Sequence, residues 1–73
     1  MARKKTTYKA LGDLLYQERM KRGMTTRELA KIVGVSHTTI YKYEYGVCEP
    51  RISHLKWIAE ALHIPLIKLV ERI

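Results

Sequence analysis

Apolar residues recur at helical spacing in five separate stretches of the chain, and no stretch alternates with a period of two residues. The first stretch contains Leu11, Leu14 and Leu15, which fall on one side of a helix that turns about 100° per residue, and it closes at Gly23. We therefore predict a first helix over residues 8–22. Because no segment alternates, we expect no strand.

The second and third helices are marked by residues that begin and end helices. Thr25, followed three residues later by Glu28, is a capping-box pattern, and the helix that it opens carries Leu29, Ala30, Ile32 and Val33. After the join formed by residues 34–36, the third helix is predicted from His37 to Tyr45. A three- or four-residue join that contains glycine is typical of a helix-turn-helix, whose two helices cross at a steep angle.

Two further helices are predicted after the loop that ends at Pro50. The fourth runs from Ile52 or Ser53 to Leu62, and its inward positions are Ile52, Leu55, Ile58, Ala59 and Leu62. Pro65 precedes a short fifth helix that carries Leu66, Leu69, Val70 and Ile73. We thus expect an all-α domain of five helices over residues 10–73, preceded by a basic arm over residues 1–9.

The third helix has two unlike sides when its residues are placed at about 100° intervals. Ile40 and Tyr43 anchor an inner side that also holds Thr39 and Glu44, and we expect the Tyr43 ring in the core with its hydroxyl at the edge. The outer side holds His37, Thr38, Tyr41, Lys42 and Tyr45. Donors, acceptors and a charge on one exposed side indicate a surface that contacts a partner.

Composition narrows the class of partner. The 73 residues carry a net charge of +7 with a pI near 9.8, which favours nucleic acid or an anionic membrane surface. The single Cys48 excludes an internal disulfide and fits a reducing cytoplasm, and the sequence shows neither a membrane span nor a signal peptide. We expect a soluble, cytoplasmic protein, which is associated with the nucleoid if the polyanionic partner is DNA.

The pattern GMTTRELAKIVGVSHTTIYKYEYG, followed by a proline and by IAEAL, resembles the Xre family of helix-turn-helix domains, which includes the phage repressors and Cro. The resemblance extends from about Leu11 to Val70. It implies the five-helix phage-repressor-like fold and sequence-specific operator binding, in most relatives as a two-fold dimer that represses or activates promoters. It also implies a prokaryotic, phage or mobile-element regulator, which we expect to be a repressor.

The resemblance places the third helix in the major groove of double-stranded DNA as the recognition helix. The candidates for reading base edges are His37, Thr38, Tyr41 and Lys42. The candidates for contacting the DNA backbone are Thr26, Arg27, Ser36, Tyr45 and Arg51, together with Arg3, Lys4 and Lys5 of the arm. The arm has an equally simple interpretation as a solvated tail, and Thr26 and Tyr45 stand where many relatives have Gln and Asn.

Two structural roles also follow from the resemblance and from helical spacing. Arg19 and Glu44 occupy positions where relatives often have an interior ion pair, although a pair of surface charges is the alternative. Trp57 lies on the outer side of the fourth helix, so we expect it to join a homodimer interface unless it folds back on its own domain. The interface residues that we predict are Trp57, Ile64, Ile67 and Val70.

Other chemistries find little support in the sequence. His37, His54, His63 and Cys48 match no zinc spacing, and no nucleophile–base pair or phosphate loop is visible, so we expect no metal, cofactor, small-molecule ligand or catalysis. Tyrosines stacked on single-stranded bases are a weaker hypothesis, because such platforms usually lie on sheets. The main alternative is that the fold serves mainly to bind protein, as an antitoxin-like or adaptor module.

Overall fold

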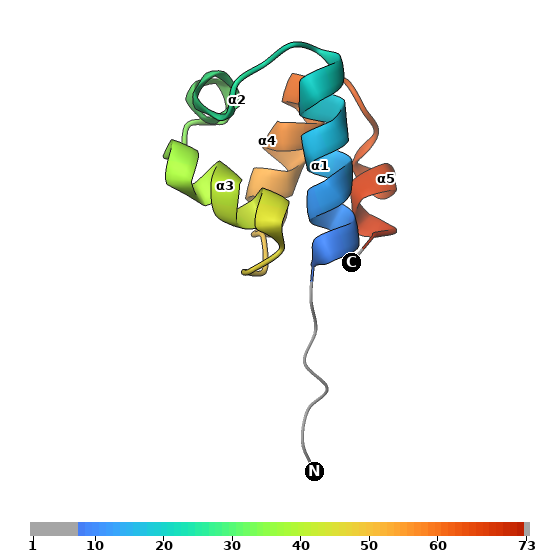
Figure 1. Ribbon diagram of the computed structural model, residues 1–73. Coiled ribbons are helices and arrows are strands. Elements are labelled where there is room, and N and C mark those ends of the chain that lie inside the picture. Colours follow the sequence, from blue (N-terminus) through green and yellow to red (C-terminus); the bar gives the residue numbers. More distant parts are fainter. Residues whose placement is uncertain (1–7, 73) are drawn as a thin grey trace.

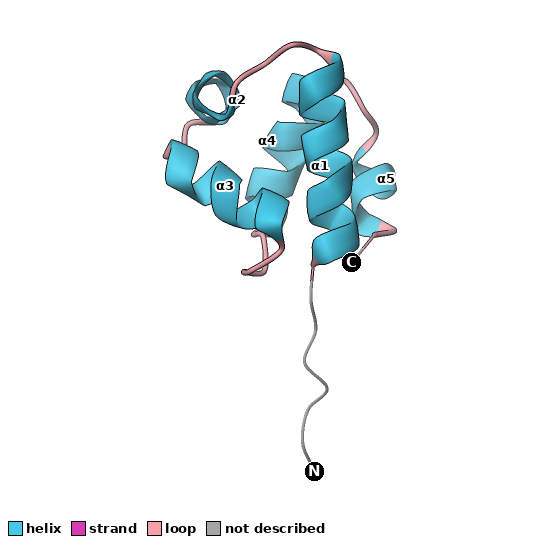
Figure 2. Cartoon of the chain, in the orientation of Figure 1, coloured by secondary structure: helices cyan, strands magenta, loops and turns pink. Residues whose placement is uncertain are grey.

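The computed structural model describes residues 8–72, which form five helices and no strand (Figures 1 and 2). These are α1 (Lys9–Lys21), α2 (Thr26–Val33), α3 (His37–Tyr45), α4 (Ile52–Leu62) and α5 (Leu66–Val70). The predicted all-α class is confirmed, and the observed bounds of α1 lie within one residue of the prediction. Lys9 already belongs to α1, so the helix begins inside the segment that we assigned to the arm.

The ends of α2 and α3 follow from their capping residues. The backbone N–H of Glu28 donates to the Thr25 hydroxyl at 3.0 Å, and the backbone N–H of Thr25 donates to the Glu28 carboxylate at 2.8 Å. Ser36 accepts the backbone N–H of Thr39 at 3.2 Å at the start of α3. Gly34 ends α2 with a φ of +88°, a conformation that glycine adopts without steric cost.

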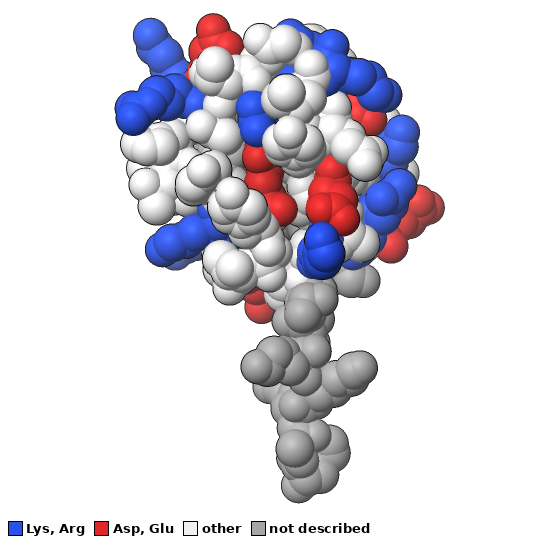
Figure 3. Space-filling model, viewed as in Figure 1, with Lys and Arg blue, Asp and Glu red and all other residues white. Residues whose placement is uncertain are grey.

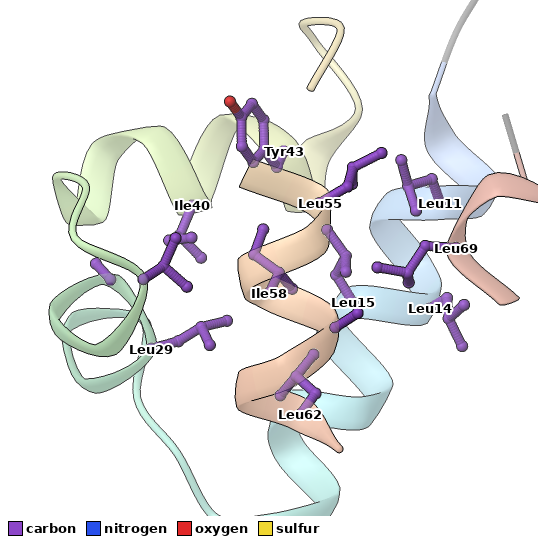
Figure 4. Packing of buried hydrophobic residues seen from close by; sticks show 13 residues of the cluster. Leu11, Leu14, Leu15, Leu29, Ile40, Tyr43, Leu55, Ile58, Leu62 and Leu69 are labelled. Atoms are coloured by element: carbon purple, nitrogen blue, oxygen red, sulfur yellow. The ribbon is translucent and has the colours of Figure 1, made fainter. Parts of the chain in front are cut away.

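The core lies between α4 and the other four helices (Figure 4). Leu55, Ile58 and Leu62 of α4 are fully buried. They meet side chains contributed by every other helix, which include Leu11, Leu15, Leu29, Ile40 and Leu69. Because burying a side chain of this size contributes about 1.5–3 kcal/mol, this cluster holds α3 in place against the rest of the domain.

Some of the apolar side chains that the helical pattern singled out lie outside the core. Ile52 was predicted to point inward, but its side chain is 63% exposed, so this prediction is wrong. At about 100° per residue Ile52 falls at the edge of the arc that holds Leu55 and Ile58, and it lies in the first turn of α4. Ile32 and Val70 are also exposed, while Ile73 lies outside the described residues.

A close approach between α1 and α3 passes through Gly12. A Cβ atom at this position would lie 2.7 Å from the carbonyl oxygen of Tyr43 and closer still to that of Glu44. Real Cβ atoms do not come this near to a carbonyl oxygen, so the two backbones pack directly on each other only because residue 12 is a glycine. No helix within residues 8–72 is long and apolar enough to cross a membrane.

Candidate nucleic-acid interface

The two sides of α3 differ in exposure as its sequence pattern predicts. Ile40, Tyr43 and Glu44 are buried against the domain. Four of the five outer residues, Thr38, Tyr41, Lys42 and Tyr45, are exposed, and His37 is half-buried in the first turn. The structure therefore leaves Thr38, Tyr41 and Lys42 accessible on the outer side of a helix that the core anchors, while His37 is partly covered.

Tyr41 and Tyr45 form a pair on this outer side. Their ring centroids lie 5.0 Å apart with an interplanar angle of 57°. A hydrogen bond with Tyr41 raises the pKa of the Tyr45 hydroxyl above its usual value. A tyrosine hydroxyl is protonated at neutral pH in any case, so Tyr45 can donate to an acceptor such as a phosphate oxygen if its hydroxyl turns away from Tyr41.

The N-terminus of α2 lies next to α3. Thr26 is half-buried and Arg27 is exposed, and Thr26 lines the same surface hollow as Tyr41. The capping box uses the backbone N–H groups of Thr25 and Glu28. It leaves the N–H groups of Thr26 and Arg27, at the positive end of the helix dipole, directed to the outside, where they suit a phosphate.

The other residues that we predicted to contact the DNA backbone differ in how free their side chains are. The Ser36 hydroxyl is already engaged by the backbone N–H of Thr39 and lies 3.0 Å from the Thr39 hydroxyl, so its first role is to cap α3. Arg51 is exposed at the N-cap of α4, and its side chain makes no cap hydrogen bond. Arg3, Lys4 and Lys5 lie outside the described residues.

Arg19 and Glu44 form a buried ion pair beneath the outer surface. Arg19 Nε donates to one carboxylate oxygen at 2.6 Å and Nη2 donates to the other at 3.0 Å, while Nη1 donates to the Met24 carbonyl at 2.7 Å. The hydrogen bond to Glu44 raises the pKa of Arg19, so the guanidinium stays charged. One side chain thus fixes α3 and the α1–α2 turn relative to α1.

A second link joins α3 to α4 and was not foreseen. The Tyr43 hydroxyl lies 2.7 Å from His54 Nδ1, and the His54 and Trp57 rings follow with centroids 5.7 Å apart. Burial raises the pKa of the Tyr43 hydroxyl. The +11 spacing of Tyr43 and His54 crosses a loop, so no helical periodicity could have paired them.

The four residues proposed for a dimer interface differ in exposure. Trp57 is 44% exposed and Ile67 is 60% exposed, and Val70 is also exposed. Ile64 is half-buried and packs against the core, so it has less surface to offer. Within residues 8–72, no three His, Cys, Asp or Glu side chains are placed to hold a metal ion.

The geometry defines the class of the domain. Helix α3 crosses α2 after a three-residue join, and Figure 1 shows the pair standing to one side of α1, with the outer side of α3 uncovered. A pair of this kind on a five-helix core is a helix-turn-helix domain.

Comparison with known proteins identifies the family. The chain belongs to the Xre, or Cro/C1-type, helix-turn-helix family, because the sequence profile described as "Helix-turn-helix" matches residues 15–69. A protein of Methanocaldococcus jannaschii, whose name places it among HTH-type transcriptional regulatory proteins, is 35% identical over 60 residues. The match covers 82% of this chain but only 19% of that relative.

Solved structures with the same fold include two regulators. The clp gene regulator ClgR of Corynebacterium glutamicum superposes with a TM-score of 0.83 and 27% identity over 96% of this chain and 74% of that chain. The P22 c2 repressor in complex with a synthetic operator superposes with a TM-score of 0.78 and 29% identity, over 81% of this chain and 89% of that chain.

Proposed function

We propose that this chain binds double-stranded DNA in a sequence-specific manner through α3 and so regulates transcription. The observation that carries the proposal is the outer side of α3, where Thr38, Tyr41 and Lys42 are exposed on a helix that the core and the Arg19–Glu44 pair hold rigidly. A rigid helix with donors and acceptors on one accessible side suits the major groove, which is wide enough to admit it.

Each candidate side chain has a distinct chemical role in this proposal. Lys42 donates to guanine O6 or N7, and Thr38 hydrogen-bonds a base edge or places its methyl group against that of thymine. His37 and Tyr41 donate or accept at neighbouring bases. The N-terminus of α2, with Thr26 and Arg27, binds a phosphate, as do Tyr45 and Arg51.

The family and its members support this assignment. The P22 c2 repressor is described in complex with an operator, and the relative from Methanocaldococcus jannaschii is named as a transcriptional regulatory protein. The net charge of +7 provides the attraction to phosphates that DNA binding of any kind requires.

The finer proposal is that the chain acts as a repressor and as a homodimer on a palindromic operator. Trp57, Ile67 and Val70 leave apolar surface exposed near the C-terminal end of the domain, and Ile64 borders it. A two-fold dimer places two copies of α3 about 34 Å apart, which is one turn of DNA. Occupying a promoter in this manner blocks transcription.

The test is selection of the purified chain on a randomised duplex pool at near-physiological salt, followed by sequencing. We expect a palindrome whose half-sites are about ten base pairs apart. A single unrepeated half-site would contradict the dimer, and a selected pool identical to the starting pool would contradict sequence-specific binding. The salt dependence of affinity then reports the number of phosphates, because log K falls linearly with log salt as counterions are released.

A further inference from the structure

A groove runs along the surface between α1 and α3. It encloses about 590 Å³ and is lined by Lys9, Asp13, Tyr16, Arg19, Met20, Tyr41, Glu44 and Tyr45. A second hollow of about 500 Å³ shares Arg19, Met20 and Tyr41 with it and leads to Thr26. We call the first of these hollows the α1–α3 groove.

The walls of the α1–α3 groove are aromatic and apolar. Tyr16 is 48% exposed and Met20 is 52% exposed on α1, and they stand opposite Tyr41 and Tyr45 on α3, of which Tyr45 is 65% exposed. Tyrosine and methionine are enriched in protein–protein interfaces, where their large side chains bury much area and methionine adapts to irregular partners. Four such side chains around one groove indicate a surface that is covered by another molecule.

The charges in the groove do not suit a phosphate. Its two basic side chains already face carboxylates: Lys9 Nζ lies 3.6 Å from the Asp13 carboxylate, and Arg19 Nε lies 2.6 Å from that of Glu44. The lining is therefore neutral on a chain whose net charge is +7. Figure 3 shows this side of the molecule, with acidic side chains in the middle of a largely uncharged area, basic side chains close to them, and further basic side chains around its edge.

The same arrangement suits a cation. The faces of tyrosine rings attract ammonium and guanidinium groups, and Arg19 already lies 5.3 Å from the centroid of the Tyr16 ring. The Asp13 carboxylate is accessible, because its pair with Lys9 is a surface ion pair of a kind that contributes about 0–1 kcal/mol. An incoming Lys or Arg side chain can therefore take the place of Lys9 without a large cost.

We propose that the α1–α3 groove docks a segment of another protein, which inserts a Lys or Arg side chain among Tyr16, Tyr41 and Tyr45 beside Asp13. Its apolar neighbours on the segment pack on Met20. The consequence rests on the proposed function: Tyr41 and Tyr45 belong to the outer side of α3, so the docked segment and DNA exclude each other. A partner of this kind removes the chain from its operator.

The first test is selection of a displayed library of random peptides on the full chain, with depletion on the Tyr16→Ser variant. We expect enriched peptides to combine a Lys or Arg with an apolar residue. Synthetic copies should bind about tenfold more weakly to Tyr16→Ser and to Asp13→Asn. A loss of this size is typical when one side chain that contributes to binding is removed from an interface. Tyr16→Phe, which keeps the ring, and Glu60→Gln, which removes an exposed carboxylate elsewhere, should bind as the unaltered chain does.

Three outcomes of the peptide selection would overturn the proposal. They are enrichment of acidic peptides, the absence of any enriched peptide, and binding that Tyr16→Ser and Asp13→Asn leave unchanged. A shift in self-association of the free chain on Tyr16→Ser, measured by sedimentation, would also overturn it, because it would make a second copy the occupant. Asp13→Asn is isosteric and lies at an accessible site, so it remains informative if Tyr16→Ser perturbs the fold.

A competition experiment tests exclusion separately. The selected peptide should release the chain from its selected duplex, and it should fail to release Tyr16→Ser from the same duplex. This control is needed because a basic peptide also binds DNA directly. Peptide binding without any DNA binding would overturn the proposed function and leave the docking site in place. DNA binding without peptide binding would overturn only the docking site.

Discussion

Gly12 of α1 lies directly against the backbone carbonyl group of Glu44 on α3, with no room for a side chain between them. This contact sets how closely α3 approaches α1. It also reverses the ordinary effect of replacing glycine in a helix. In most helices, changing glycine to alanine stabilises the fold by about 0.5–1 kcal/mol.

Gly12→Ala should therefore destabilise the domain, by about 1–3 kcal/mol as expected for overpacking against rigid backbone. Urea unfolding of the variant measures the change, and Gln17→Ala, at an exposed position of the same helix, is the control. A gain of stability in Gly12→Ala would show that α1 and α3 are not held this closely.

The buried pair of Arg19 and Glu44 predicts an asymmetric response to substitution. Arg19→Met or Glu44→Gln alone leaves one buried group without its partner and should cost about 3–5 kcal/mol. The double variant should lose less than the sum of the two single changes, because neither charge is then left alone. Additive losses in a double-mutant cycle would show that the two groups act independently.

The carboxylate of Glu18 predicts a dependence of stability on pH. A hydrogen bond from Arg22 at 2.7 Å holds the pKa of buried Glu18 below its ordinary value of 4.5. The pair therefore stabilises the fold fully above pH 4.5, and this contribution is lost as the pH falls from there through the lowered pKa. Glu18→Gln should show a shallower loss of stability over this window than Glu60→Gln, and equal pH profiles of the two variants would contradict the role of Glu18.

Substitutions of base-reading residues and of phosphate-binding residues should reduce the affinity for DNA in different ways. Lys42→Ala or Thr38→Ala should cost about 1–3 kcal/mol on the selected site and weaken its preference over other sequences. Thr26→Ala or Arg27→Ala should weaken binding to all duplexes by a similar factor. Titration of each variant on the selected and on a scrambled duplex separates the two, and a uniform loss for Lys42→Ala would remove it from the base-reading set.

The proposed dimer interface predicts that a charge on α5 blocks association. Ile67→Glu should keep the chain monomeric in sedimentation experiments and abolish cooperative binding to paired half-sites, while binding to one half-site persists. Ile32→Glu places the same charge at another exposed apolar position, on α2, and should leave association intact. Unchanged association of Ile67→Glu would exclude this surface.

The elements of the fold were predictable because their signals are local. Thr25, Glu28 and Ser36 mark the helix starts within a few residues of the groups that they cap, and helical spacing separates Ile40 and Tyr43 from the outer side of α3. The all-α architecture follows from these patterns together.

What the sequence could not provide depends on residues that are far apart along the chain. In the sequence, Gly12 is only a residue that weakens α1, and its purpose becomes clear when the backbone of Glu44 lies against it. Tyr43 and His54 meet only in the folded domain, where α3 and α4 come together. Tyr16 and Met20 read as ordinary exposed residues of α1, because the groove that they line requires α3 opposite. Ile52 was predicted to point inward because periodicity shows which side of a helix faces the core. It does not show where along the helix the packing against the core begins, and Ile52 is exposed in the first turn.

Trp57 gives the molecule an intrinsic fluorescent reporter on the surface of α4. It is the single tryptophan of the chain, its ring is partly exposed beside that of His54, and α3 carries no tryptophan. Indole emission shifts to shorter wavelength when water leaves its surroundings, so dimerisation over α4 and α5 should produce a blue shift in the unlabelled protein. DNA binding by a single subunit should leave the emission maximum in place, and the two events can then be timed independently in one cuvette.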